Sequence, residues 1–132
     1  MNADEKAVAN VLNQYEAALN ASSTRAVMPL YADDGVFMPQ NFPSSVGAEA
    51  IRNAYDTVFD AIQLTVMFAV QEIRQVSPDW VMARTNSAGS VKVHATGESQ
   101  AEANQELFLF QKVAGTWKIA RYAFSTTKPA AQ

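Results

Sequence analysis

The stretch that decides the fold is residues 101–127, AEANQELFLFQKVAGTWKIARYAFSTT. Two apolar-rich runs flank Ala114-Gly115, a dipeptide typical of a tight turn, so the stretch is predicted to form a β-hairpin. If Val113 pairs with Thr116, the side chains alternate between two faces along the whole hairpin. The first face then holds Asn104, Glu106, Phe108, Phe110, Trp117, Ile119 and Arg121. The second face holds Gln105, Leu107, Leu109, Ala120, Tyr122 and Phe124.

Both faces of this hairpin are apolar enough to need a cover. The first mixes polar and aromatic side chains, as a ligand pocket does, so we assign it to the interior of the protein. The second would be an unusually large exposed apolar patch on a monomer, so we expect another copy of the chain to cover it. The side chains expected at this homodimer interface are Leu107, Leu109, Tyr122 and Phe124.

Length and composition indicate one globular domain. The chain has 132 residues, of which 48% are hydrophobic and 17% charged, and this balance is typical of a protein with a packed core. We therefore predict a single domain over residues 1–132, with residues 128–132 as a flexible tail. The net charge of −3 argues against a nucleic-acid-binding surface, which would be basic.

Several classes of site and location are disfavoured by what the sequence lacks. It contains no cysteine, so disulfides and thiolate chemistry are excluded, and the single histidine, His94, lies in a polar stretch without other metal ligands. We expect no metal and no cofactor. No apolar run is long enough for a membrane span, and the acidic start MNADEKAVAN does not resemble a signal peptide. A cytoplasmic location is expected, with a trimmed export signal left open.

Before the hairpin, the spacing of the apolar residues is typical of helices in some segments and of strands in others. Apolar residues at helical spacing predict a helix over about residues 3–20, followed by a shorter helical piece from Ser22 or Ser23 that Pro29 interrupts. Residues 33–35, Asp-Asp-Gly, indicate a turn, with Asp34 the better placed of the two acids to face inward, and residues 36–38 a short strand.

A third helix and two long strands follow. Gly47 precedes an amphipathic helix that runs to about Ile62, and the period then changes from 3.6 to 2. Residues 63–76 and 80–91 are predicted strands, joined by a turn at residues 77–79. The order α-α-β-α-β-β-β-β predicts an α+β fold with the helices on one face of the sheet.

Four strings, in this order, resemble the nuclear transport factor 2-like superfamily in its SnoaL-like branch: LYADDGVFMP (30–39), GAEAIRNAY (47–55), SPDWVMAR (77–84) and AGTWKIARYAFS (114–125). The resemblance covers essentially the whole chain. It implies a cone in which a strongly bent mixed or antiparallel sheet wraps three N-terminal helices and encloses a pocket. It also implies frequent dimerisation through the outer sheet face. Activities in the superfamily are diverse, so the fold implies a pocket rather than a reaction.

Three charged residues form the sharpest candidate site. Arg121 and Glu106 share the first face of the hairpin, and the resemblance implies that Arg84, with Asn86 on the same face, also points into the cone. Two guanidinium groups around one carboxylate would leave a cationic fork for a carboxylate or phosphate of a ligand. The alternatives are a structural Arg–Glu pair, or arginines that extend to solvent.

Tyr15 is the second candidate. The resemblance places it where ketosteroid isomerases of the superfamily have a tyrosine that stabilises an oxyanion, although a plain core tyrosine fits the sequence equally well. Where those isomerases carry an aspartate base, this chain has Phe37-Met38-Pro39, so their mechanism is not expected. Further candidate pocket residues, each also compatible with a core position, are Tyr55, Phe108, Met38 and Phe42, the last as a lid.

The sequence thus predicts a small-molecule-binding protein with an enclosed, mostly apolar pocket. If it is an enzyme, Glu106 is the candidate acid or base and Tyr15 stabilises negative charge in a lyase, isomerase or hydratase reaction on a small carbonyl or carboxylate compound. The alternative is a non-catalytic ligand-binding or dimerisation module of the same fold. No nucleic-acid or membrane partner is expected.

Overall fold

The computed structural model describes residues 1–128. The predicted tail, residues 128–132, therefore lies outside the described residues except for Lys128. The elements in chain order are α1 (Ala3–Asn20), α2 (Thr24–Val27), a 3₁₀ helix η1 (Met28–Leu30), β1 (Tyr31–Met38), β2 (Ser45–Val46), α3 (Ala48–Ala61), β3 (Ile62–Ser77), β4 (Trp80–Val93), β5 (Ser99–Val113) and β6 (Thr116–Thr126).

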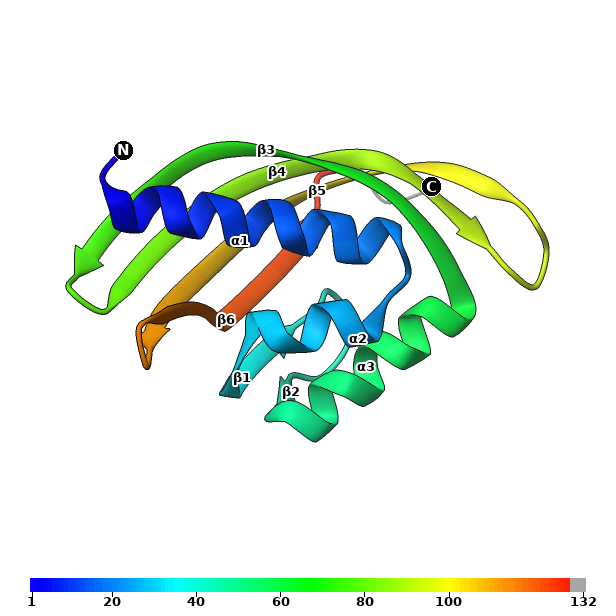
Figure 1. The fold of residues 1–132 in the computed structure, drawn as a ribbon. Helices are drawn as coiled ribbons and strands as arrows, with labels where there is room; N and C mark the ends of the chain where they lie inside the picture. Colours follow the sequence, from blue (N-terminus) through cyan, green and yellow to red (C-terminus); the bar gives the residue numbers. More distant parts are fainter. Residues whose placement is uncertain (129–132) are drawn as a thin grey trace.

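The strands form a single six-stranded sheet in the order β2-β1-β6-β5-β4-β3. β1 runs parallel to β6, and every other neighbouring pair is antiparallel. The long strands bend around the helices, and α1 lies along the concave side (Figure 1). This arrangement confirms the predicted α+β cone and its element order, with the short strand β2 as an addition.

Helix α1 begins at a capping box. The Asn2 side chain accepts a hydrogen bond from the Glu5 amide at 2.8 Å, and the Glu5 carboxylate accepts one from the Asn2 amide at 3.0 Å. Asp4 ties the same turn to the β5–β6 hairpin by accepting a hydrogen bond from the Trp117 indole at 3.1 Å. The buried face of the helix then carries Val8, Val11, Leu12, Tyr15, Ala18 and Leu19.

The turn predicted at residues 33–35 is wrong. Strand β1 runs through these residues, and its pairing with β6 shifts between Tyr31, opposite Ile119, and Val36, opposite Arg121. Such a bulge absorbs extra residues within a strand, so turn-forming residues do not end it. Asp33 and Asp34 are both exposed on the bulge, so the expectation that Asp34 faces inward is also wrong.

Helix α3 packs against β1 and β2. Gly47 precedes it with a φ of +88°, a left-handed conformation that favours glycine. The buried face of α3 presents Ile51, Tyr55 and Phe59 toward the core. Within residues 1–128, none of the helices combines the length and the apolar character that crossing a membrane requires.

The β5–β6 hairpin has the predicted two-residue turn. Ala114 and Gly115 both have positive φ, 50° and 81°, as the favoured type I′ hairpin turn requires. The predicted register holds from Val113 opposite Thr116 to Phe110 opposite Ile119.

Beyond that point a bulge changes the register. Leu109 pairs with Arg121, which leaves Ala120 as an extra residue on β6. Because side chains alternate along a strand, every β6 residue after the bulge lies on the face opposite to the predicted one. Tyr122 and Phe124 therefore face the interior, and Arg121 does not.

Candidate functional site

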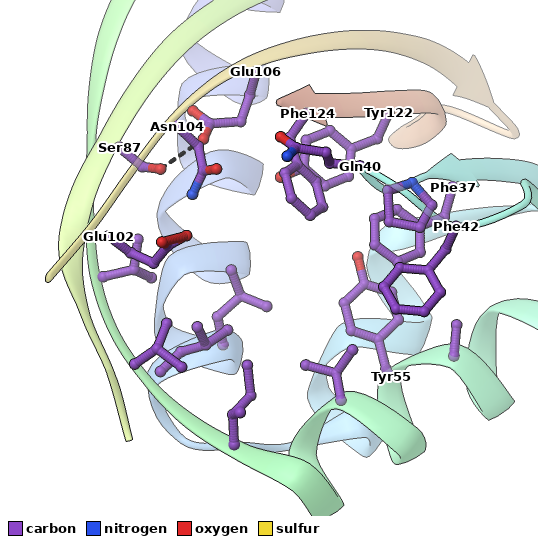
Figure 2. Close-up of a pocket in the computed structure, with 18 of the residues that line it drawn as sticks. Phe37, Gln40, Phe42, Tyr55, Ser87, Glu102, Asn104, Glu106, Tyr122 and Phe124 are labelled. Carbon is purple, nitrogen blue, oxygen red and sulfur yellow. Dashed lines mark hydrogen bonds between the residues drawn. The ribbon is translucent and has the colours of Figure 1, made fainter. Parts of the chain in front are cut away.

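A cavity of about 810 Å³ opens between the concave face of the sheet, α3 and the loop of residues 39–44. Its lining is mainly apolar and aromatic, with polar side chains from β4, β5, α3 and the loop (Figure 2). The volume is in the range of pockets for small organic molecules. Phe42, whose side chain is 73% exposed, stands at the mouth.

Glu106 is the buried acid of this cavity. Only 5% of the residue is exposed, although it lines the cavity. Its two carboxylate oxygens accept hydrogen bonds from the hydroxyls of Thr85 and Ser87, each at 2.6 Å. Thr85 lies directly opposite Glu106 on the neighbouring strand, so the pairing of β4 with β5 builds this cluster.

Burial raises the pKa of the Glu106 carboxyl above its ordinary value of 4.5, and the Ser87 and Thr85 hydroxyls offset only part of that effect. Burial removes water from the charged form and so disfavours it. Among residues 1–128, the cavity lining contains no lysine, arginine or histidine. A carboxyl with a raised pKa on an apolar cavity is a stronger base than an ordinary carboxylate and is suited to accept and return a proton.

Three tyrosine hydroxyls form a buried chain beside the cavity. Tyr55 lies in the middle, 2.6 Å from the hydroxyl of Tyr15 and 2.7 Å from that of Tyr31. Burial raises the pKa of all three phenols, so all are protonated at neutral pH. The Glu106 carboxylate adds to this increase at Tyr15, which indicates that the two groups are near one another.

One of the three hydroxyl protons in this chain is not used in the hydrogen bonds between the tyrosines. Three hydroxyls carry three protons, and the two hydrogen bonds use two of them. If Tyr31 donates to Tyr55 and Tyr55 donates to Tyr15, the spare proton is on Tyr15. Tyr15 lines the cavity, whereas Tyr31 does not. In that arrangement Tyr15 can donate to an oxygen atom of a bound molecule.

Four of the residues singled out in the sequence lie on the cavity: Tyr15, Tyr55, Glu106 and Phe42. Phe108 does not. Its side chain is fully buried and stacks on Tyr122, with 4.2 Å between the ring centroids, so it supports the cavity wall from behind. Met38 is 39% exposed and points away, because its neighbour Phe37 takes the inward position on β1.

The expectation that Arg84 points into the cone is wrong. Its side chain is 54% exposed and its Nε donates to the Glu72 carboxylate at 2.7 Å, on the outer face of the sheet. The inward positions on β4 belong to Thr85 and Ser87, which are buried, while Asn86 is exposed. Strand alternation therefore places Arg84 and Asn86 together, as predicted, but on the opposite face.

Arg121 also misses the cavity, because of the bulge at Ala120. Its guanidinium donates to the backbone oxygens of Asp34 and Ala120. The predicted cluster of two arginines around Glu106 is thus not formed, and Glu106 is held by hydroxyls instead. The cationic fork for a carboxylate or phosphate has no counterpart in the cavity.

Other residues in or next to the cavity were missed or left without a role by the sequence analysis. Thr85, Ser87 and Tyr31 gave no signal of their own, because small polar residues and tyrosine are common in ordinary strands. Glu102 and Asn104 precede Glu106 at alternate positions on β5, and this spacing alone could have placed all three on one face. Within residues 1–128, no group of three or more acidic or histidine side chains is arranged to hold a metal ion.

The open sheet bent around three helices, with a cavity on its concave side, defines the cone fold of the nuclear transport factor 2-like class. Within that class the chain belongs to the SnoaL-like domain family, whose model matches residues 11–122. The resemblance found in the sequence is thereby confirmed.

Solved structures agree with this assignment. A ketosteroid isomerase-like protein from Erwinia carotovora atroseptica is 33% identical over 98% of this chain and 100% of its own, with a TM-score of 0.93. A conserved protein from Planctomyces limnophilus is 23% identical over 94% of this chain and 98% of its own, with a TM-score of 0.82. A hexachlorocyclohexane dehydrochlorinase shares the fold at 13% identity and a TM-score of 0.82, over 96% of this chain and 86% of its own. No curated protein matches the chain.

Proposed function

We propose that the protein binds a small, largely apolar carbonyl compound in the cone and that Glu106 transfers a proton to and from a carbon atom of it. The observation that carries this proposal is a buried carboxyl with a raised pKa on an open, apolar cavity. The described neighbours include a ketosteroid isomerase-like protein and a dehydrochlorinase. Isomerisation beside a carbonyl and loss of hydrogen chloride both require a base that takes a proton from carbon, which supports the same role for Glu106.

Glu106 and Tyr15 have different roles in the proposed reaction. The Glu106 carboxylate takes a proton from the carbon next to the carbonyl, and the electron pair moves to the carbonyl oxygen. Tyr15 donates its spare proton in a hydrogen bond to that oxygen, which stabilises the developing negative charge. In a compound with a carbon–carbon double bond next to that carbon, return of the proton from Glu106 to the far end of the double bond shifts the bond and completes an isomerisation. Because none of the described residues that line the cavity is cationic, a carboxylate compound, the other substrate class considered from the sequence, fits less well.

The proposal predicts exchange of carbon-bound hydrogen. Incubated with cyclohexanone in D₂O, the protein should speed the entry of deuterium beside the carbonyl, followed by proton NMR. Glu106→Gln should lower this rate about 100-fold, the usual scale for a general base. The wild-type rate should fall as the pH drops through the pKa of Glu106, above 4.5, because only the ionised carboxyl accepts a proton. Glu98→Gln, an exposed site away from the cavity, serves as the matched control.

The second candidate is a ligand-binding module without catalysis. This candidate is favoured by the two short hydrogen bonds from Thr85 and Ser87, which occupy both oxygens of the Glu106 carboxylate. A carboxylate with a purely structural role would be bound in the same way. If the wild-type protein does not accelerate exchange above buffer between about pH 5 and pH 9, while small apolar molecules still bind, the module is the correct description.

We propose further that two copies of the chain associate through the outer face of the sheet. The corrected register changes the contact residues: Leu107, 47% exposed, and Leu109 remain on this face, whereas Tyr122 and Phe124 face the cavity. Light scattering at micromolar concentration should report a dimer, and Leu107→Lys should convert it to a monomer. Val46→Lys, which places the same charge at an exposed valine on β2, should not. A monomeric wild-type protein would contradict the proposal.

A further inference from the structure

The cavity has two chemically different walls (Figure 2). Ser87 and three side chains of β5, those of Glu102, Asn104 and Glu106, point into the cavity from one side. Aromatic side chains line the other side, among them Phe37, Phe42 and Tyr55. A molecule that fills the cavity must therefore combine an apolar part with a group that satisfies the polar wall.

The polar wall presents acceptors, and two of its three β5 side chains are acidic. Among residues 1–128, no basic side chain lines the cavity to neutralise them. The two arginines that could have done so are engaged elsewhere, Arg84 with Glu72 and Arg121 with backbone oxygens. The field in the cavity is thus negative, which repels anions and attracts cations.

Glu106 and Glu102 differ in whether their carboxylate oxygens already accept hydrogen bonds. Both oxygens of Glu106 accept hydroxyl hydrogen bonds. The Glu102 carboxylate has no hydrogen-bond or ion-pair partner among the side chains of residues 1–128, although the residue is partly buried. Its direct neighbour on β4 is Gly89, which has no side chain to cover it. Glu102 is therefore the acid that is open to a ligand.

The two acids are also separated along the strand. Glu106 lies four positions after Glu102 on β5, which corresponds to roughly 13 Å in an extended strand. A group bound at Glu102 would lie on the polar wall, across the cavity from Phe42 (Figure 2), and would leave the proton-transfer position at Glu106 free. One elongated molecule can therefore use both positions.

From this arrangement we infer that the natural ligand carries a protonated amine, which pairs with the Glu102 carboxylate while the apolar body lies against the aromatic wall. The inference rests on the proposed function, because it assumes that the cavity binds a small molecule. The Asn104 side-chain oxygen can accept a second hydrogen bond from the ammonium group. The substrate class becomes an amine-bearing, largely apolar compound.

Three probes of similar size and different charge test this inference: 2-phenylethylamine, 2-phenylethanol and 3-phenylpropanoate. Calorimetric titration at pH 7 should give the amine about tenfold tighter binding than the alcohol, the scale of one charge-assisted hydrogen bond. The carboxylate should bind weakest. Glu102→Gln should reduce the affinity for the amine to that for the alcohol and leave the alcohol unaffected, whereas Glu98→Gln should change neither.

The possible outcomes separate the two proposals. If the amine and the alcohol bind equally well and Glu102→Gln alters neither, the inference about the amine is overturned and the ligand-binding function stands. If none of the three probes binds, the proposed function fails together with the inference. The melting temperature of Glu102→Gln serves as the control. If it equals that of the wild type, a lower affinity for the amine is not caused by unfolding.

Discussion

Gly89→Ala is expected to destabilise the protein by about 3 kcal/mol, the upper end of what overpacking usually costs. A Cβ atom at this position would lie 1.8 Å from the backbone oxygen of Thr65 and 2.8 Å from its carbonyl carbon. Those atoms belong to β3, the neighbouring strand, on which Val66 pairs with Gly89. Since the obstacle is backbone and not a flexible side chain, only a shift of the strand can relieve it.

The same change at Gly97 provides the matched control. Gly97 has a φ of +72°, but no atom lies within 4 Å of the Cβ position there. Gly97→Ala should therefore cost only the conformational penalty, about 1 kcal/mol. Urea unfolding of the two variants gives the comparison. Equal losses would contradict the view that Gly89 is required for the close approach of β3 and β4 behind the cavity.

The elements of the fold could be predicted because their signals are local. The apolar stripe of α1, the period of two in the long strands, and the Ala114-Gly115 turn are each encoded within a few residues. The hairpin register was also right near its turn, where the turn geometry sets it. The family followed from the order of these elements together with short strings.

The site could be predicted only in part, because it depends on bulges. Ala120 is a small apolar residue in an apolar run, and nothing in the sequence indicates that β6 contains an extra residue there. That single residue moved Arg121 out of the interior and brought in Tyr122 and Phe124. Glu106 was placed correctly because β5 has no shift against β4.

The prediction that arginines line the pocket was wrong for a related reason. Arg84 was placed inward by resemblance alone, and its alternation with Thr85 is compatible with either face. What decides the face is the partner each side chain finds: Arg84 meets Glu72 across the outer surface, and Thr85 meets Glu106 within the cone. Such partners come from β3 and β5, at distances in sequence that a local pattern does not report.

Tyr55→Phe is expected to cost about 2–4 kcal/mol, because it leaves the buried Tyr31 hydroxyl without a partner, at about 1–3 kcal/mol, and removes the hydrogen bond between Tyr55 and Tyr15, at about 1 kcal/mol. Tyr55 is the only described hydrogen-bond partner of the Tyr31 hydroxyl and links it to Tyr15. Within residues 1–128, no buried side-chain nitrogen or oxygen lacks a partner in the native protein. The variant introduces such a group at Tyr31, next to the cavity, without changing the shape of the ring at position 55.

Tyr31→Phe is the graded control, because it removes one hydrogen bond of the chain and leaves Tyr55 bonded to Tyr15. It should cost about 1 kcal/mol, as a single hydrogen bond does. Thermal unfolding of both variants should therefore rank Tyr55→Phe clearly below Tyr31→Phe. Deuterium exchange into cyclohexanone should also slow in Tyr55→Phe, because a hydroxyl polarised by a second hydroxyl is the stronger donor. If Tyr31→Phe is as damaging as Tyr55→Phe, the three phenols do not act as a chain centred on Tyr55, and Tyr15 must be oriented by something else.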